Sequence, residues 1–305
     1  MELTDLLGDL STKVDDVLTT VPEVPTVDDP SLSDIPGQGS TKWLKIPNVV
    51  AVVFDLKGST HLGTGRHDTS TARLYKSAVE SAVAILNEFE AQFVDIQGDG
   101  GFGVFWGDLD FERALCAGVT IRTFSETLVS KFNNKWSDGN FPETGFKVGI
   151  ASGRVLVKQL GTPRNVDEQE AVWAGKPVNY AAKAAQEADA HELIVTGSVW
   201  DHFQENDYVA FSCDCRGGAS ATLWGDFTIE RLRDEKEKYG RRLKAGWCTA
   251  CGPEFCSAIR AGVRGRDIPT QARHHLAKTQ MSTALAEKAQ EDRRRRSSLR
   301  SLRGK

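Results

Sequence analysis

The sequence predicts an α+β fold in which one sheet is covered by helices. Continuous β-branched runs, such as residues 49–54, have the length of strands buried on both faces. Segments with apolar residues at helical spacing lie between these runs, for example from Leu74 to Phe89. Strands and helices alternate without the strict βαβ period of a parallel sheet, which favours the α+β class.

The N-terminal part of the chain divides into a helix, a linker and the first buried strand. Residues 3–18 have the composition of one short helix, whereas residues 20–40 contain four prolines and several acids and should form an extended linker. The run VVAVVF at 49–54 is uninterrupted and ends abruptly in Asp55. The amphipathic helix that follows has candidate caps at 68–71.

The later elements follow from shorter signals. Two strands, 93–96 and 101–105, flank the tight turn Gln97-Gly98-Asp99-Gly100, which is a hairpin signal. Apolar spacing predicts a helix at about 110–131. β-branched or alanine-rich runs predict the remaining elements, which are strands 146–151 and 155–160 around the turn Ser152-Gly153, helix 179–189 and strand 193–196.

Composition limits the classes of protein to consider. The 305 residues carry 38 basic and 42 acidic side chains, and this net charge of −4 argues against a nucleic-acid binder. No apolar run approaches the roughly 20 residues of a membrane span, and the acidic N-terminus does not resemble a secretory signal. We expect a cytoplasmic protein without a membrane partner. The predicted domains are an acidic tail and linker (1–40), a main domain (41–232), and a Cys-containing segment with a basic tail (233–305).

Two aspartates carry the strongest chemical signal. Asp55 and Asp99 each follow a strand and lie close to glycine in the sequence. Carboxylates on adjacent strand ends suit hard divalent cations, and the turn Gly58-Ser59-Thr60 offers backbone N–H groups to phosphate oxygens. The alternative is that both acids only form turns, in which Asp and Gly are common. Together, the residues meet the requirements of a metal–triphosphate site.

Four ordered segments resemble class III nucleotidyl cyclases, which convert nucleoside triphosphates into 3′,5′-cyclic monophosphates. The segments are VVFDLKGST, FVDIQGDGGFGVFWG, FKVGIASGRVLV and WAGKPVNYAAKA. The likeness runs from about Trp43 to about Leu232, so residues 41–232 are expected to be the catalytic domain. It implies a mainly antiparallel sheet and a head-to-tail homodimer with two equivalent sites at its seam.

The resemblance also implies the metal and phosphate ligands. Two divalent cations, Mn²⁺ or Mg²⁺, would be bridged by Asp55, Asp99 and the backbone carbonyl of Leu56, as in two-metal displacement reactions. The backbone of Gly58-Ser59-Thr60 would bind the triphosphate. The family usually has Phe at the position of Ser59, so the contact made by this loop is expected to differ.

Two residues of the alanine-rich helix match the family's transition-state helix. Asn179 corresponds to the asparagine that positions the ribose. Four residues later the family has an arginine that stabilises charge on the α-phosphate, and this chain has Lys183, which offers a charge without the bidentate fork. Alternatively, Lys183 is a solvated helix residue. The resemblance implies that Asn179, Lys183 and Asp95 act on the partner protomer's metal site.

The base-contacting positions depart from those of purine cyclases. Asp95 stands where purine-specific members have Lys or Glu. A carboxylate accepts hydrogen bonds, so it suits the N3–H of uracil, the amino group of cytosine or the N1–H edge of guanine. Trp173, near the other usual base-contacting position, would narrow the pocket towards pyrimidine size, or it serves only in packing. We favour UTP, because N3 of cytosine is itself an acceptor.

Within the class, the sequence is most similar to the pyrimidine cyclases of bacterial Pycsar anti-phage systems. This likeness implies that UTP is converted to cyclic UMP and diphosphate, and that a separate effector protein binds the cyclic nucleotide. The alternatives are a cytidylate, guanylate or adenylate cyclase and a catalytically silent nucleotide-binding regulator. A zinc- and arginine-based nucleic-acid module is disfavoured by the near-neutral net charge.

The C-terminal segment contains a candidate structural zinc site. Cys248, Cys251 and Cys256, with His274 or His275 downstream, would supply its ligands. The alternative is a set of unliganded thiols. The arginine run 293–296 either contacts nucleic acid or forms a solvated tail.

Overall fold

The computed structural model describes residues 2–64, 66–136, 141–161, 169–213, 215 and 221–266. These residues form two compact units. Unit 1 contains the chain up to His202 and returns for Asp226–Trp247, whereas unit 2 contains Phe203–Gly225 and the chain from Cys248 onward. The predicted basic tail and both of its histidines lie outside the described residues. The predicted domain boundaries at residues 40 and 232 do not coincide with any boundary between the two units. The division of the chain into three parts therefore stays a prediction.

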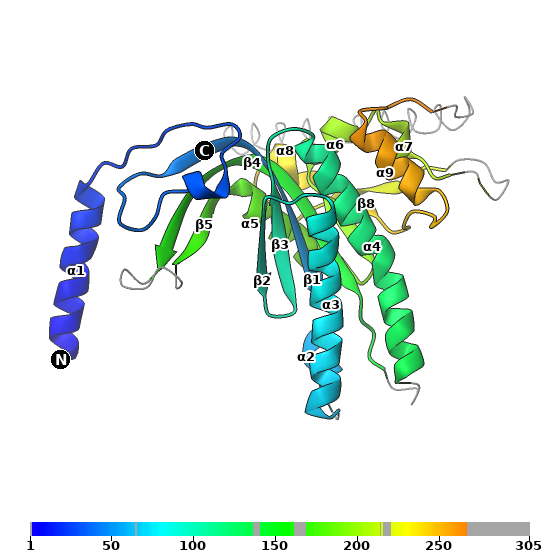
Figure 1. Ribbon diagram of the computed structural model, residues 1–305, viewed down its shortest axis with the longest axis horizontal. Helices are drawn as coiled ribbons and strands as arrows, with labels where there is room; N and C mark the ends of the chain where they lie inside the picture. Colours follow the sequence, from blue (N-terminus) through cyan, green and yellow to red (C-terminus); the bar gives the residue numbers. More distant parts are fainter. Residues whose placement is uncertain are drawn as a thin grey trace, which may run out of the picture. The chain divides into compact units, whose positions relative to one another are not determined.

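A mainly antiparallel sheet is the framework of unit 1 (Figure 1). Its strand order is β2-β3-β1-β4-β6-β8-β7, and β5 pairs with β4 outside this path. The strands are β1 (Leu44–Leu56), β2 (Phe93–Gln97), β3 (Gly100–Phe105), β4 (Phe146–Gly161), β5 (Gln169–Gly175), β6 (Glu192–Val195), β7 (Trp224–Thr228) and β8 (Tyr239–Leu243). Only β4–β6 is parallel among the pairs β1–β3, β1–β4, β2–β3, β4–β5, β4–β6 and β6–β8. This architecture confirms the predicted fold class.

Helices cover both faces of the sheet. The helices are α1 (Leu3–Thr19), α2 (Ser59–Leu62), α3 (Asp68–Glu88), α4 (Asp110–Lys135), α5 (Lys176–Glu187), α6 (Gly197–Phe203), α7 (Asp207–Ala210), α8 (Glu235–Lys238), α9 (Gly252–Arg260) and the 3-10 helix η1 (Leu32–Asp34). Gly149 and Ile150 are successive residues of β4 and therefore face opposite sides. The backbone of α5 lies against Gly149, and Gly118 of α4 lies against the Ile150 side chain. The sheet is thus enclosed between α5 and α4.

Small residues allow α5 to approach the sheet closely. A Cβ atom at Gly149 would lie 2.0 Å from the carbonyl oxygen of Ala181, so only glycine fits there. Ala51, Ala151 and Ala181 form a buried cluster at the same contact. This close packing holds α5, with its predicted transition-state residues, directly over β1 and β4.

The two predicted strands at 146–151 and 155–160 are one continuous strand, β4. The irregularity lies instead on the neighbouring strand, where the register of β1 shifts between Ile46 and Val49. Pro47 cannot donate a ladder hydrogen bond, so a bulge at this position is expected on physical grounds. Gly153 keeps β4 continuous with a φ of 150°, which side chains of L-residues rarely adopt.

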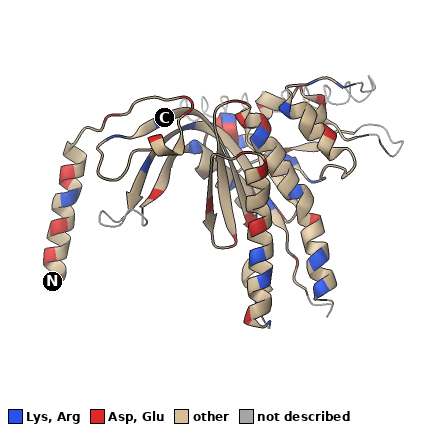
Figure 2. Cartoon of the chain, in the orientation of Figure 1, with Lys and Arg blue, Asp and Glu red and all other residues tan. Residues whose placement is uncertain are grey.

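The proline-rich segment 20–40 contains the 3-10 helix η1 within the predicted extended linker, and it packs onto unit 1. Val27 donates its backbone N–H to the carbonyl of Lys45, and the indole of Trp106 donates to the carbonyl of Pro30 at 2.9 Å. Ile35 joins the hydrophobic core. Helix α1 precedes this linker and has no buried residue, and its acidic residues are distributed along its length (Figure 2). Among the described residues, no helix combines the length and apolarity that crossing a bilayer requires.

Candidate active site

Asp55 lies at the end of β1, in the middle of the sheet. The neighbouring Phe54 is fully buried, whereas the Asp55 side chain is 42% exposed. Lys147, its register partner on β4, places Nζ 2.7 Å from Asp55 Oδ2. Lys147 is not among the residues predicted from the sequence, although a lysine in the otherwise apolar run FKVGIA is a usable signal. This ion pair balances the charge of the predicted metal ligand.

The β2–β3 turn brings Asp99 to the same edge of the sheet. Gly98 has a φ of 67°, which allows the tight turn, and Asp99 is half-buried. A Cβ atom at Gly100 would lie 2.6 Å from the carbonyl oxygen of Phe54 and 3.3 Å from Asp55 Oδ1. The residue next to Asp99 therefore touches the end of β1. Carboxylate oxygens are hard donors that suit a divalent cation. This sheet edge, which carries Asp55 and Asp99, is therefore the candidate metal edge.

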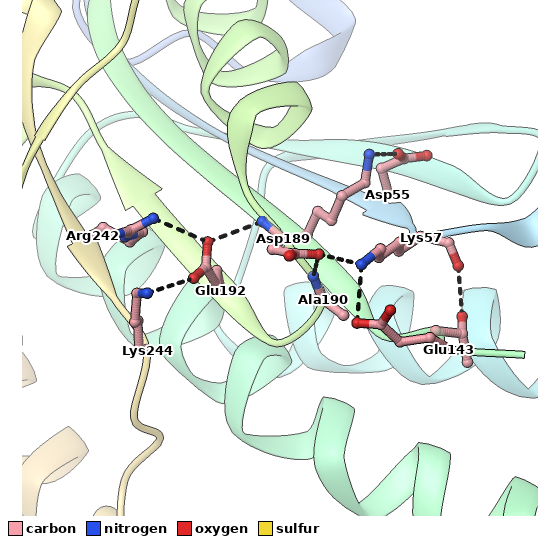
Figure 3. A network of polar contacts seen from close by, with 10 residues as sticks. Asp55, Lys57, Glu143, Asp189, Ala190, Glu192, Arg242 and Lys244 are labelled. Atoms are coloured by element: carbon pink, nitrogen blue, oxygen red, sulfur yellow. Dashed lines mark hydrogen bonds and ion pairs between the residues drawn. The ribbon is translucent and has the colours of Figure 1, made fainter.

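The loop after β1 is held by ion pairs. Leu56 is buried, and Lys57 lies 2.5 Å from Asp189 Oδ1 and 3.0 Å from Glu143 Oε1 (Figure 3). These partners raise the pKa of Lys57, and Lys57 in turn lowers the pKa of Asp189. Residues 58–60, which are predicted to bind phosphate, follow, and Gly58 has the left-handed conformation where α2 begins. Lys57 thus fixes the backbone that the sequence predicts to contact the triphosphate.

A cavity of about 420 Å³ lies between the candidate metal edge and helix α5. Asp55, Gln97 and Asn179 contribute to its lining, together with Gly100 of the β2–β3 hairpin. The Asn179 side chain donates to the carbonyl of Gly175 at 2.8 Å, which directs it along the first turn of α5. The structure therefore brings Asp55 and Asn179 around one cavity of a single chain, with a volume in the range of small-molecule sites.

The other predicted site residues, among them Asp95, Asp99 and Lys183, are absent from the lining of this cavity. Gln97 donates its side-chain amide to Asp95 Oδ2 at 3.1 Å, so Gln97 links Asp95 to the cavity. Lys183 is half-buried, with Nζ 5.7 Å from the centre of the Tyr180 ring. Gln97 was missed because an exposed glutamine in a hairpin carries no distinctive pattern.

Trp173 packs in the core of unit 1. It is 7% exposed, and its ring centre lies 5.1 Å from that of Phe93 and 5.6 Å from that of Trp106. It is absent from the lining of the cavity that contains Asp55. The structure favours the packing role over base contact for this residue. Its contact with Phe93 on β2 supports the strand that also carries Asp95.

Unit 2 contains a cysteine cluster whose members differ from the predicted zinc ligands. Its four sulfur atoms all lie within 4.8 Å of one another and belong to Cys213, Cys215, Cys248 and Cys251. Cys256, a predicted ligand, lies along α9 and is not part of the cluster. Backbone N–H groups of Cys251 and Ala250 lower the pKa of Cys248 to about 7, whereas hydrogen bonds with the neighbouring thiols, first that of Cys213, raise the pKa of Cys215 to about 12.

The fold of unit 1 matches that of class III nucleotidyl cyclase catalytic domains. The crystal structure of the adenylyl cyclase CyaB from P. aeruginosa aligns with a TM-score of 0.52 at 13% identity, covering 65% of this chain and 94% of that chain. At this identity the match shows the fold alone. Cyclases of this class use divalent metal ions, and the oxygen donors at Asp55 and Asp99 suit them.

Two full-length relatives place the chain more narrowly. A uridylate cyclase of Propioniciclava tarda is 55% identical over 303 residues, which cover 99% of this chain and 98% of the relative. A uridylate cyclase of Micromonospora echinofusca is 46% identical over 302 residues, covering 97% and 96%. No family model matches the sequence. The chain belongs to the uridylate cyclase family.

Proposed function

We propose that this protein converts UTP into 3′,5′-cyclic UMP and diphosphate. The observation that carries the proposal is the 55% identity over 99% of the chain with a relative named uridylate cyclase. The cavity beside Asp55 supports it, because this cavity gives a candidate metal ligand room for a substrate. Catalysis then requires only positioning and charge stabilisation at the reacting phosphate.

Asp55, Asp99 and the carbonyl of Leu56 would hold two divalent cations, Mg²⁺ or Mn²⁺. When bound, these ions lower the pKa of the ribose 3′-hydroxyl and neutralise the triphosphate. Gly100 keeps a side chain away from the Asp55 carboxylate, which leaves the metal edge open. The ion pairs of Lys57 lie directly before residues 58–60, whose backbone would bind phosphate oxygens.

The remaining groups orient the ribose and the α-phosphate. The 3′-oxygen gives its proton to water and bonds to the α-phosphorus, while the bond from that phosphorus to the bridging oxygen breaks and releases diphosphate. The Asn179 amide would hold the ribose for this attack, and Lys183 would place a positive charge near the developing negative charge. Lysine contributes here as a point charge, since it lacks the fork of an arginine.

Uracil would be recognised through Asp95. Its carboxylate accepts the uracil N3–H, and Gln97 orients it by donating to Oδ2. Trp173 would contribute indirectly, by packing against Phe93 on the same strand. Cytosine would bind less well, because its unprotonated N3 and the Asp95 carboxylate are both hydrogen-bond acceptors. Placed opposite each other, they would form no hydrogen bond.

The proposal extends to assembly and biological role. The protein would act as a head-to-tail homodimer in the cytoplasm, which supplies nucleoside triphosphates. Cyclic UMP would then activate a separate effector protein during phage infection, as the resemblance to Pycsar cyclases implies. A rise of cyclic UMP in infected cells that depends on Asp55 is the expected observation, and resistance that persists without this rise would contradict the role.

The activity is tested with the purified full chain. The protein is incubated with Mn²⁺ and, separately, with ATP, GTP, CTP or UTP, and the products are resolved by chromatography and mass spectrometry. We expect cyclic UMP and diphosphate in equal amounts. Asp55→Ala should lower the rate by at least about a thousandfold, because it removes a ligand shared by both ions. Circular dichroism of the variant serves as the folding control.

Each other outcome has a distinct meaning. Cyclic CMP or a purine cyclic nucleotide as the main product would retain the cyclase chemistry and overturn the role of Asp95. Product formation that survives Asp55→Ala would overturn the metal site. No product from any of the four nucleotides would contradict the proposed activity of the chain by itself.

A further inference from the structure

The cysteine cluster of unit 2 joins two segments that are distant in the sequence. Cys213 and Cys215 follow helix α7, and Cys248 and Cys251 precede α9. The Sγ atoms of Cys213 and Cys215 are 3.4 Å apart, and those of Cys215 and Cys248 are 3.6 Å apart. These separations exceed the length of a disulfide bond, about 2.05 Å, and all six cysteines are unbridged. The segments therefore meet through four thiols.

The geometry matches one tetrahedral metal ion. Four thiolates bound at a Zn–S distance of about 2.3 Å lie roughly 3.8 Å from one another. The two measured separations are close to this value, and none of the sulfur pairs exceeds 4.8 Å. Four sulfur ligands occupy every position of a tetrahedral ion, as in structural rather than catalytic zinc sites.

Both cysteine-bearing segments are held in shape by their own backbones. In the second segment, N–H groups of Ala250 and Cys251 donate to the sulfur of Cys248, and the N–H of Gly252 donates to its carbonyl at 2.7 Å. Hydrogen bonds from backbone N–H groups to a ligating sulfur are the outer-shell support that metal thiolates require. The first segment is closed by the hydrogen bond from Ser212 to Ala221, at 2.8 Å.

The size of unit 2 gives a reason for such a site. Its described buried apolar side chains are few, and they include Phe211, Phe255 and Ile259. A core of this size stabilises a fold only weakly, and small units gain stability from disulfides or a bound metal. A metal ion at the cluster would tie together the two segments from which unit 2 is built.

We propose that Cys213, Cys215, Cys248 and Cys251 bind one structural Zn²⁺ ion. The ion stabilises unit 2 and takes no part in nucleotide chemistry. This site is independent of the proposed cyclase activity, since it uses none of the residues around the Asp55 cavity. It also replaces the ligand set that the sequence predicts, because Cys256 is excluded from it.

The first test measures metal content in the full-length wild-type protein. Elemental analysis should find one zinc per chain after dialysis against metal-free buffer, and the protein with cobalt in place of zinc should show the absorption of a tetrahedral thiolate site. Titration of the wild-type protein with a mercurial reagent should release the zinc as four thiols react. Absence of zinc, or a disulfide between any two cluster cysteines under non-oxidising purification, would overturn the proposal.

Variants then identify the ligands. Cys248→Ser and Cys215→Ser should each weaken zinc binding by at least about tenfold and increase proteolytic cleavage within unit 2. Cys256→Ser is the matched control, because it removes a nearby thiol outside the cluster and should retain one zinc per chain. Loss of zinc in Cys256→Ser with retention in Cys215→Ser would contradict the proposed ligand set. If a cluster variant fails to fold, the thiol titration of the wild-type protein still decides the question.

Discussion

Asp95 is the residue on which the proposed preference for uracil depends. Its carboxylate accepts a hydrogen bond from Gln97 and retains further acceptor positions for a base. A carboxylate cannot donate to the N3 of cytosine, whereas an amide of the same size can both donate and accept. The preference for uracil over cytosine therefore depends on whether the side chain at position 95 can donate a hydrogen bond.

We expect Asp95→Asn to relax the preference between UTP and CTP. The ratio of kcat/KM for UTP to that for CTP should fall by about tenfold or more. The reason is that the asparagine amide can pair with either base, whereas the carboxylate cannot donate to cytosine N3. Rates with each nucleotide, measured at saturating Mn²⁺, give this ratio. Gln97→Leu should lower the rate with UTP, because it removes the donor that orients Asp95. An unchanged ratio in Asp95→Asn would show that Asp95 does not read the base.

The sequence predicts individual site residues when their type alone carries chemistry. Asp55 and Asp99 are predictable because carboxylates beside glycines at strand ends are chemically distinctive. Lys147 is harder to predict, because its importance arises from the register of β4 against β1, which joins residues 92 positions apart. The burial of Trp173 likewise depends on contacts with Phe93 and Trp106, which no local pattern reveals.

At the scale of elements, the approach of the β2–β3 hairpin to β1 builds the candidate metal edge. Gly100→Ala should move the hairpin, because its Cβ atom would lie 2.6 Å from the carbonyl oxygen of Phe54. We expect a loss of about 1–3 kcal/mol in the free energy of unfolding and a fall in kcat of at least about tenfold. Gly39→Ala is the matched control, since nothing lies within 4 Å of its Cβ position.

Denaturant unfolding and steady-state rates check both effects of Gly100→Ala. The Gly39 variant should match the wild type in each measurement. A Gly100 variant with wild-type rates would show that the position of the hairpin does not control the site. A variant with lower stability and a proportionate loss of folded protein, but normal turnover per folded molecule, would lead to the same conclusion.

The elements that the sequence reveals are those with strong local patterns. The buried run of β1 and the amphipathic stripe of α3 agree with the predicted strand and helix, and the Gly-Asp-Gly turn marks the hairpin correctly. Strands β7 and β8 were not predicted, because YGRRL at 239–243 is short and rich in arginine. β8 becomes a strand through its pairing with β6, which is a tertiary contact.

At the scale of the whole molecule, the central question is how many chains build one active site. The class III resemblance implies that Asp55 and Asp99 of one protomer act with Asn179 of its partner. In the single chain, Asp55 and Asn179 line one cavity of about 420 Å³. A cavity shared by these residues within one chain does not require both to serve the same substrate, because a partner chain would supply a second copy of each group at the seam.

Mixed dimers distinguish these arrangements. If each site combines two protomers, exchange of subunits between inactive Asp55→Ala and Asn179→Ala proteins should restore about a quarter of wild-type activity. Half of the dimers are then mixed, and each mixed dimer has one intact site out of two. A mixture of Asp55→Ala with Asp99→Ala is the control and should stay inactive, because both ligands belong to the same half-site. Failure of the first mixture, with subunit exchange demonstrated by mass spectrometry, would place Asp55 and Asn179 of one chain in the same active site.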